Sequence, residues 1–177
     1  FSIEMHHQTV PAAVAGYNVG MVVKFPKGTK PKQVRRGDLM FRPTDFASTP
    51  EILPRRVKSF RAAVKVQNHP GQLKAGFEPQ MCVRTGRCAS RIKEIHWVLG
   101  KRTGGKKLEG ADFVQKHEMA EITFEPQGFL YLEPFSRSEA YGRVAGMESK
   151  SLVMMGKILE VEYDNAGQPL PIAHDDM

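Results

Sequence analysis

The sequence predicts an all-β chain, in which an antiparallel barrel or sandwich follows a smaller and incomplete β unit. Two observations lead to this fold class. Short runs that alternate apolar and polar residues recur along the 177 residues, and turns that contain Gly and Pro separate them. Such spacing is typical of antiparallel barrels and sandwiches, and helical signals are few.

The clearest strand signal lies at residues 59–66, SFRAAVKV. Every second residue from Phe60 to Val66 is apolar, and Arg61 and Lys65 fall on the other face. A period of two predicts a half-buried strand, and the turn NHPGQ follows it. Further strands are expected at residues 79–85, 118–126, 128–135 and 151–163.

The N-terminal part has three shorter strand candidates, at residues 2–5, 20–25 and 38–43. Three such strands bury too little surface to stabilise a separate domain, so we expect the opening strands of this barrel upstream. The following segment, 44–56, carries two prolines and resembles a linker. The expected organisation is therefore the C-terminal part of a first barrel at 1–53, a second barrel at 54–163 and a polar tail at 164–177.

The chain is basic, with 26 Lys and Arg against 19 Asp and Glu and a net charge of +7. This balance favours a polyanionic partner, usually RNA, and is equally compatible with a solubilising surface. Cys82 and Cys88 are the only cysteines, which argues against a zinc cage and fits a reduced compartment. No run approaches the 18 apolar residues of a membrane span, and no signal peptide is visible.

No constellation of residues in the sequence points to catalysis. The chain contains neither the G-x-x-x-x-G-K-S/T phosphate loop nor the G-x-S-x-G nucleophile motif. His6 and His7 are expected on a strand, where adjacent side chains point to opposite faces and could not bind one ion together. We therefore expect no catalytic residue, no metal and no cofactor in this chain.

Long collinear motifs resemble the elongation factor 1-alpha family. They are SIEMHHQTVPAAVAGYNVG (2–20), VRRGDL (34–39), QNHPGQLKAGFEP (67–79), GGKKLEG (104–110) and YGRVAG (141–146) ahead of LVMMGKI (152–158). The similarity covers nearly the whole chain up to residue 163. It implies two antiparallel β-barrels of the translation elongation factor type, the first of them incomplete.

The resemblance also implies a function, which is to help deliver aminoacyl-tRNA to the ribosome in a GTP-dependent factor. In that family GTP and magnesium are bound by a GTPase domain, which would lie upstream of Phe1. The chain itself is therefore not expected to be an enzyme. A guanine nucleotide exchange factor and actin are further partners that the resemblance implies, in the cytoplasm and without a membrane.

Two sets of binding residues follow from the resemblance. The pocket for the 3′-terminal adenosine and the aminoacyl group would be lined by Glu4, His6, His7 and Asn18. The face that grips the T-stem of tRNA would carry Gln80, Arg84, Glu148, Ser149 and Lys150. Basic side chains on that face would contact phosphates, which position an RNA without reading its sequence. The alternative for both sets is an ordinary solvated surface.

Several positions depart from the family pattern. Tyr17 stands in place of an acid, Met147 in place of an arginine, Gly105 is an added residue, and the C-terminal end HDDM is acidic where the family is rich in Lys. These departures keep a second function open. In this alternative the chain is a diverged paralogue, repurposed as a structural or protein-binding subunit of a large ribonucleoprotein or cytoskeletal assembly.

Overall fold

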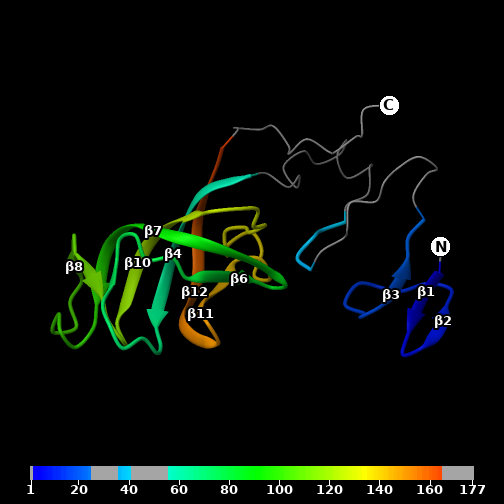
Figure 1. Cartoon of the computed structure of the whole chain (residues 1–177), viewed down its shortest axis with the longest axis horizontal. Helices are drawn as coiled ribbons and strands as arrows, with labels where there is room; N and C mark the ends of the chain where they lie inside the picture. Colours follow the sequence, from blue (N-terminus) through cyan, green and yellow to red (C-terminus); the bar gives the residue numbers. More distant parts are fainter. Residues whose placement is uncertain (1, 25–35, 41–55, 165–177) are drawn as a thin grey trace. The chain divides into compact units, whose positions relative to one another are not determined.

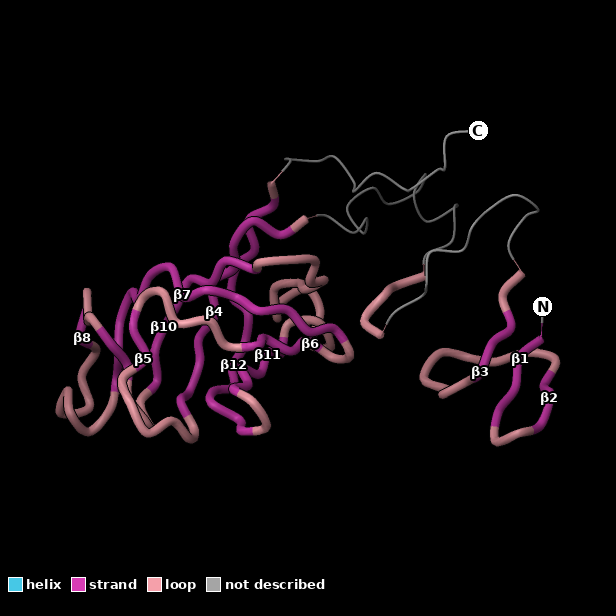
Figure 2. Tube along the Cα trace, in the orientation of Figure 1, coloured by secondary structure: helices cyan, strands magenta, loops and turns pink. Residues whose placement is uncertain are grey.

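The computed structural model describes residues 2–24, 36–40 and 56–164, and all the regular secondary structure within them is β (Figures 1 and 2). The predicted all-β fold class is confirmed. The described residues belong to two compact units, residues 2–24 and residues 36–40 with 56–164. In these ranges no helix is long and apolar enough to cross a membrane.

The first unit is a three-stranded antiparallel sheet in the order β2–β1–β3. Its strands are β1 (Ser2–Met5), β2 (Gln8–Val10) and β3 (Gly20–Val22). None of the residues from 2 to 24 is fully buried, because three short strands cannot cover an apolar face by themselves.

Two of the three strands expected in this part form. SIEM is β1, and β3 covers only the first three residues of GMVVKF. In DLMFRP, residues 38–40 are not in a strand. Residues 41–43 lie outside the described residues, as do 44–55 of the linker and 165–177 of the tail. Strand β2 was not predicted, because neither Gly nor Pro marks the turn before it.

The second unit is a closed antiparallel barrel (Figure 1). Six strands pair in the cyclic order β4–β12–β11–β6–β7–β10, and β10 returns to β4, so that each of them has two partners within the cycle. They are β4 (Val57–Val66), β6 (Gln80–Val83), β7 (Gly86–Leu99), β10 (Met119–Pro126), β11 (Arg143–Glu148) and β12 (Ser151–Tyr163). Three short strands lie outside the cycle, β5 (Leu73–Lys74), β8 (Leu108–Glu109) and β9 (Phe113–Val114).

The interior of the barrel is filled by alternate residues of these strands. Phe60, Ala62, Val64 and Val66, every second residue of β4 in this stretch, are each at most 1% exposed, as the period of two predicts. Phe60 stacks on Phe124 of β10 with 5.2 Å between ring centroids, which joins two neighbouring strands by aromatic packing. The intervening residues Arg61 and Lys65 lie on the outer face, where Arg61 is half-buried and Lys65 is exposed.

The longest strand, β7, was not predicted. Cys88, Ser90 and Ile92 are buried with a period of two, but the next buried residues are Ile95 and Val98. Two register shifts against β10 cause this change of phase. A bulge inserts an extra residue and interrupts the alternation, so the pattern of β7 does not stand out in the sequence.

The strand predicted at residues 128–135 does not form. Leu130 and Leu132 are buried in the core, which explains the alternation that suggested a strand. Every strand of the closed barrel already pairs with at least two others, and of the described segments only the two-residue strand β8 joins this cycle from outside, near the end of β7. Pro134 also has no backbone N–H to donate. The segment therefore packs on the core without joining the sheet.

Gly156 provides a test of how closely β12 approaches β4. A Cβ atom at this position would lie 2.1 Å from the carbonyl oxygen of Ala63 and 2.8 Å from Cα of Val64. We expect Gly156→Ala to lower the free energy of unfolding by about 1–3 kcal/mol, as overpacking does, measured by chemical denaturation. The control is Gly71→Ala, where the nearest atom is a side-chain carbon of His69 at 3.3 Å. Equal stability of the two variants would contradict the close approach.

Candidate functional site

His6 and His7 form the turn between β1 and β2. Met5 pairs with Gln8, so the two histidines are the whole loop of a hairpin. Both have left-handed backbones, with φ of 51° and 64°. Two-residue hairpin loops of this kind favour Asn-Gly, because each residue must adopt a positive φ. The prediction that the two histidines lie on a strand with opposite facing is therefore wrong, because the strand ends one residue earlier.

The turn borders a polar hollow of about 310 Å³. We call it the hairpin hollow, and it is lined by Glu4, His6, His7, Asn18, Val19 and Gly20. Pairing of Glu4 with Gly20 brings the segment before β3 next to β1. This pairing places Asn18 beside the hairpin. The four residues that the sequence grouped as a pocket thus line one concavity, with a carboxylate, two imidazoles and an amide as donors and acceptors.

Tyr17 does not line the hairpin hollow, and its side chain is 57% exposed. Its backbone N–H donates to the carbonyl of Val14 at 3.2 Å, which closes a turn before Asn18. Within the described ranges, no group of three or more His, Cys, Asp or Glu side chains is arranged to hold a metal ion.

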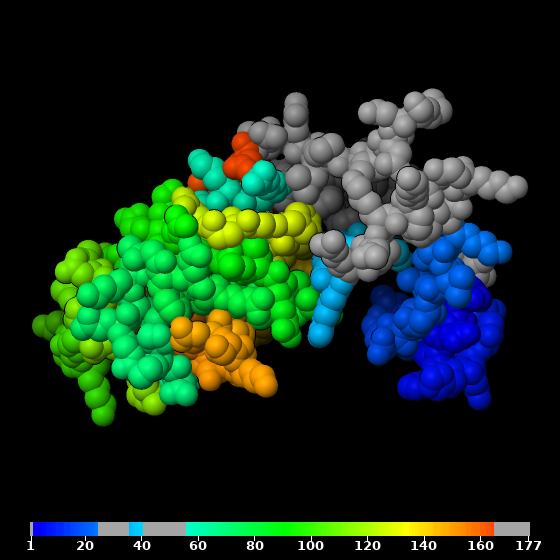
Figure 3. All heavy atoms as spheres, viewed as in Figure 1, coloured from blue at the N-terminus to red at the C-terminus, as the bar shows by residue number. Residues whose placement is uncertain are grey.

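The residues grouped as a T-stem face lie at two places on the barrel. Gln80 opens β6 and pairs with Met147 of β11. Glu148 ends β11, and Ser149 and Lys150 form the turn into β12, with a φ of 53° at Ser149. Figure 3 shows this region, in orange, exposed on the surface of the barrel. Gln80 and the β11–β12 turn are therefore neighbours.

Arg84 is separated from that group. It follows the last residue of β6, with a φ of 51°, and lies about 13 Å from Gln80 at the usual rise of a strand. Its guanidinium carbon is 5.6 Å from the centre of the Tyr141 ring. The structure thus assigns Arg84 to a different part of the outer surface.

His69 lies next to the β11–β12 turn, and it was not among the predicted site residues. Its Nε2 lies 3.5 Å from a carboxylate oxygen of Glu148, and its ring makes an edge contact with Phe77. The backbone N–H of Gly71 donates to its Nδ1 at 3.1 Å. The motif NHPGQ was interpreted only as a turn, and no signal within it points to a partner about 80 residues away.

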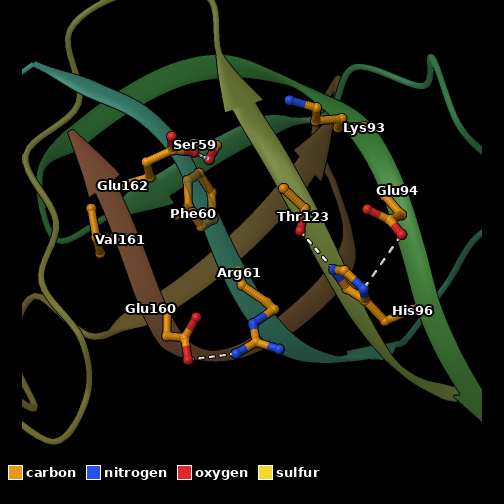
Figure 4. Close-up of a pocket in the computed structure, with 10 residues that line it drawn as sticks. All are labelled: Ser59, Phe60, Arg61, Lys93, Glu94, His96, Thr123, Glu160, Val161 and Glu162. Carbon is orange, nitrogen blue, oxygen red and sulfur yellow. Dashed lines mark hydrogen bonds and ion pairs between the residues drawn. The ribbon is translucent and has the colours of Figure 1, made fainter. Parts of the chain in front are cut away.

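The basic residues around position 58 are paired with acids on or next to β12 and on β10. Arg56 pairs with Asp164 at 3.2 Å, and Lys58 with Glu162 at 2.6 Å. Arg61 binds Glu160 at 2.5 Å and Glu121 at 2.8 Å, and these contacts raise its pKa. Figure 4 shows the outer hollow of about 490 Å³ where Arg61 meets Glu160 and His96 contacts Thr123 and Glu94. This surface is internally neutralised.

Glu162 has a pKa below its usual range, because it accepts hydrogen bonds from Lys58 and from Ser59. A depressed carboxyl pKa contributes stability above its ordinary value, and this contribution is lost as the pH falls through the folded value. We expect Lys58→Ala to raise the pKa of Glu162 towards normal, measured by NMR titration of the carboxyl carbon. Lys65→Ala, on the same strand, is the control, and an equal shift in both variants would contradict the pairing.

The closed barrel and the sheet before it have the fold of the β-barrel part of elongation-factor-type translational GTPases. Residues 59–159 match the family described as "GTP-eEF1A C-terminal domain-like", and the chain belongs to this family. The predicted resemblance is confirmed.

Curated relatives match over most of the chain. Elongation factor 1-alpha of Tetrahymena pyriformis is 34% identical over 161 residues, which cover 91% of this chain and 35% of that protein. The protein of the same name from Halobacterium salinarum is 33% identical, with 91% and 36% covered. The chain thus spans about a third of the length of these relatives.

A solved structure, described as "crystal structure analysis of sup35 complexed with GMPPNP", shares the fold. Its TM-score is 0.69 at 17% identity, and the match covers 91% of this chain and 37% of that one.

Proposed function

We propose that the chain is the tRNA-binding β-barrel portion of an elongation factor 1-alpha-like protein, which helps to deliver aminoacyl-tRNA to the ribosome. GTP and magnesium would be bound by a part of the factor outside this chain, and a nucleotide exchange factor and actin are further candidate partners. The observation that carries the proposal is the hairpin hollow, where Glu4, His6, His7 and Asn18 converge.

The hairpin hollow has the size and chemistry for a small polar group. Its volume of about 310 Å³ is at the lower end of ligand pockets, which measure roughly 300–1,000 Å³. Imidazole rings offer stacking faces to an adenine, and a carboxylate accepts from its amino group. The amide of Asn18 offers both a donor and an acceptor to an aminoacyl ester.

The backbone strain at the hairpin turn supports a binding role. Two adjacent non-glycine residues with positive φ destabilise a turn by roughly 1–2 kcal/mol each, and Asn-Gly would avoid this. Strained residues of this kind gather at ligand sites, where the backbone holds side chains ready for contact. His6 and His7 would present their imidazoles to the ligand in this way.

The turn between β11 and β12 would supply a second contact. Lys150 is exposed at this turn next to Ser149, so its ammonium group can approach a phosphate. The backbone of an RNA stem is recognised by such contacts without regard to sequence. Gln80, on the neighbouring strand, would add a hydrogen bond to the same stretch of backbone.

Asn18→Ala tests the hairpin hollow. Loss of the amide should weaken binding of aminoacylated tRNA by about 0.5–1.5 kcal/mol and leave deacylated tRNA almost unchanged, measured by fluorescence anisotropy of labelled tRNA. Asn68→Ala is the matched control, because Asn68 lies in an exposed turn of the barrel. If Asn18→Ala weakened both tRNAs alike, the amide would not read the aminoacyl end.

Lys150→Ala tests the phosphate contact. We expect both tRNAs to bind more weakly by the same factor, and the slope of log K against log salt to fall by about 1. Lys101→Ala is the control, because Lys101 is exposed on the turn between β7 and β8. An unchanged salt slope would remove Lys150 from the interface.

If neither Asn18→Ala nor Lys150→Ala changed tRNA affinity, the second function would take the place of the first. The barrels would then serve as a structural or protein-binding subunit of a ribonucleoprotein or cytoskeletal assembly. Exposed apolar side chains on the barrel, among them Met119, Met155 and Leu159, would support this alternative.

A further inference from the structure

The outer face of the barrel contains an apolar groove of about 730 Å³. Its floor consists of small residues on four strands, and we call it the small-residue groove after them: Ala63, Cys82, Ala145 and Gly156. Ala145 lies between Cys82 and Met155 in the sheet, and Ala63 lies opposite Lys157. Because neighbouring strands carry short side chains here and long ones on either side, the surface is hollowed.

Three large apolar side chains stand exposed along the groove. Met119 is 42% exposed, Met155 46% and Leu159 39%. Met119 belongs to β10, and Met155 and Leu159 belong to β12, so the fold of the barrel brings residues from two strands together on this face. Contiguous exposed apolar surface marks an interaction site, and Met adapts its shape to different partners.

The polar groups that border the groove are positive. Lys65, Arg84, Arg143 and Lys157 line it, and among the residues that the structure describes no Asp or Glu does. Arg143 also contacts Glu139 at 3.2 Å outside the groove. The groove differs in this respect from the outer hollow of Figure 4, where Arg61 is bound by two acids.

Two of these cations are held in place by an aromatic ring. The Nζ of Lys157 lies 4.1 Å from the centre of the Phe135 ring, and the guanidinium carbon of Arg143 lies 5.0 Å from it. Cation–π contacts restrict the conformations of long side chains. Binding of a partner here therefore costs less side-chain entropy at Lys157 and Arg143.

We propose that the small-residue groove docks a segment of another protein in which apolar side chains are flanked by acidic ones. Apolar side chains would lie on the floor against Met119, Met155 and Leu159, and carboxylates would meet Lys65, Arg84, Arg143 and Lys157. Opposite charges across an interface speed association and fix its register. This site is independent of the hairpin hollow and extends the proposed function to a protein partner.

A nucleic acid fits the groove less well. Single-stranded nucleic acid is bound by stacking bases on aromatic side chains along a positive groove, and none of the described residues that line this groove is aromatic. An apolar floor gives a phosphate backbone no hydrogen bond. The combination of apolar floor and basic border is that of helix-in-groove recognition.

The probe is a fluorescein-labelled amphipathic peptide with Leu at positions i, i+3, i+4 and i+7 and Glu on both flanks. A second peptide carries Lys in place of every Glu. We expect the 177-residue chain to bind the acidic peptide at least about tenfold more tightly in an anisotropy titration, which is 1.4 kcal/mol. No saturable binding of the acidic peptide, or equal binding of the two, would overturn the proposal.

Cys82 gives a second readout at the site itself. It is partly exposed on the floor of the groove, whereas Cys88 is buried. The acidic peptide should slow alkylation of Cys82 by N-ethylmaleimide at least about threefold, followed by mass spectrometry, because an occupied groove excludes the reagent. Unchanged alkylation in the presence of saturating peptide would place the peptide elsewhere and overturn the assignment.

Variants complete the test. Met155→Glu and Lys157→Glu should each weaken binding of the acidic peptide at least about tenfold. Leu108→Glu and Lys101→Glu, which make the same changes outside the groove, should not. Thermal unfolding of each variant controls for folding.

Equal losses in a groove variant and its matched control would overturn the proposal. So would a single-stranded RNA probe that lost affinity on Lys157→Glu while the peptide did not, because the basic border would then serve a nucleic acid.

Discussion

The pairing of β10 with both β4 and β7 closes the barrel, and the other features of this unit depend on that closure. A further segment such as residues 128–135 packs its leucines on the core without forming a strand of this cycle. The remaining places for interaction are the turns and the outer faces of strands. The β11–β12 turn and the small-residue groove are examples of each.

Charge divides the outer surface of the barrel into two kinds of face. Where β4 meets β12, Arg61 and Lys58 are bound by glutamates, so the net field there is small. Around the small-residue groove the bordering side chains are all basic. The positive net charge of the chain is thus unevenly distributed. An anionic partner is attracted to particular places and not to the barrel as a whole.

The first unit is built in another way. None of its described residues, 2–24, is fully buried, and the residues that line the hairpin hollow lie in a two-residue turn, on β1 and in the segment up to β3. The strained backbone of His6 and His7 holds the imidazoles at the border of the hairpin hollow. Barrel and sheet therefore present two different surfaces, a rigid one built from paired strands and a smaller one built around a turn.

The sequence by itself determined the fold class, the buried face of β4 and the extent of β12, because alternation within one strand is a local property that neighbouring residues carry. It also determined the family, through long collinear motifs. Only the tertiary structure decided that His6 and His7 form a turn and that β7 contains bulges. It also decided that Ala63, Cys82, Ala145 and Gly156 form one floor. These features depend on which residues face each other across strands. The alternation of apolar and polar residues within one strand does not determine which distant segment pairs with it.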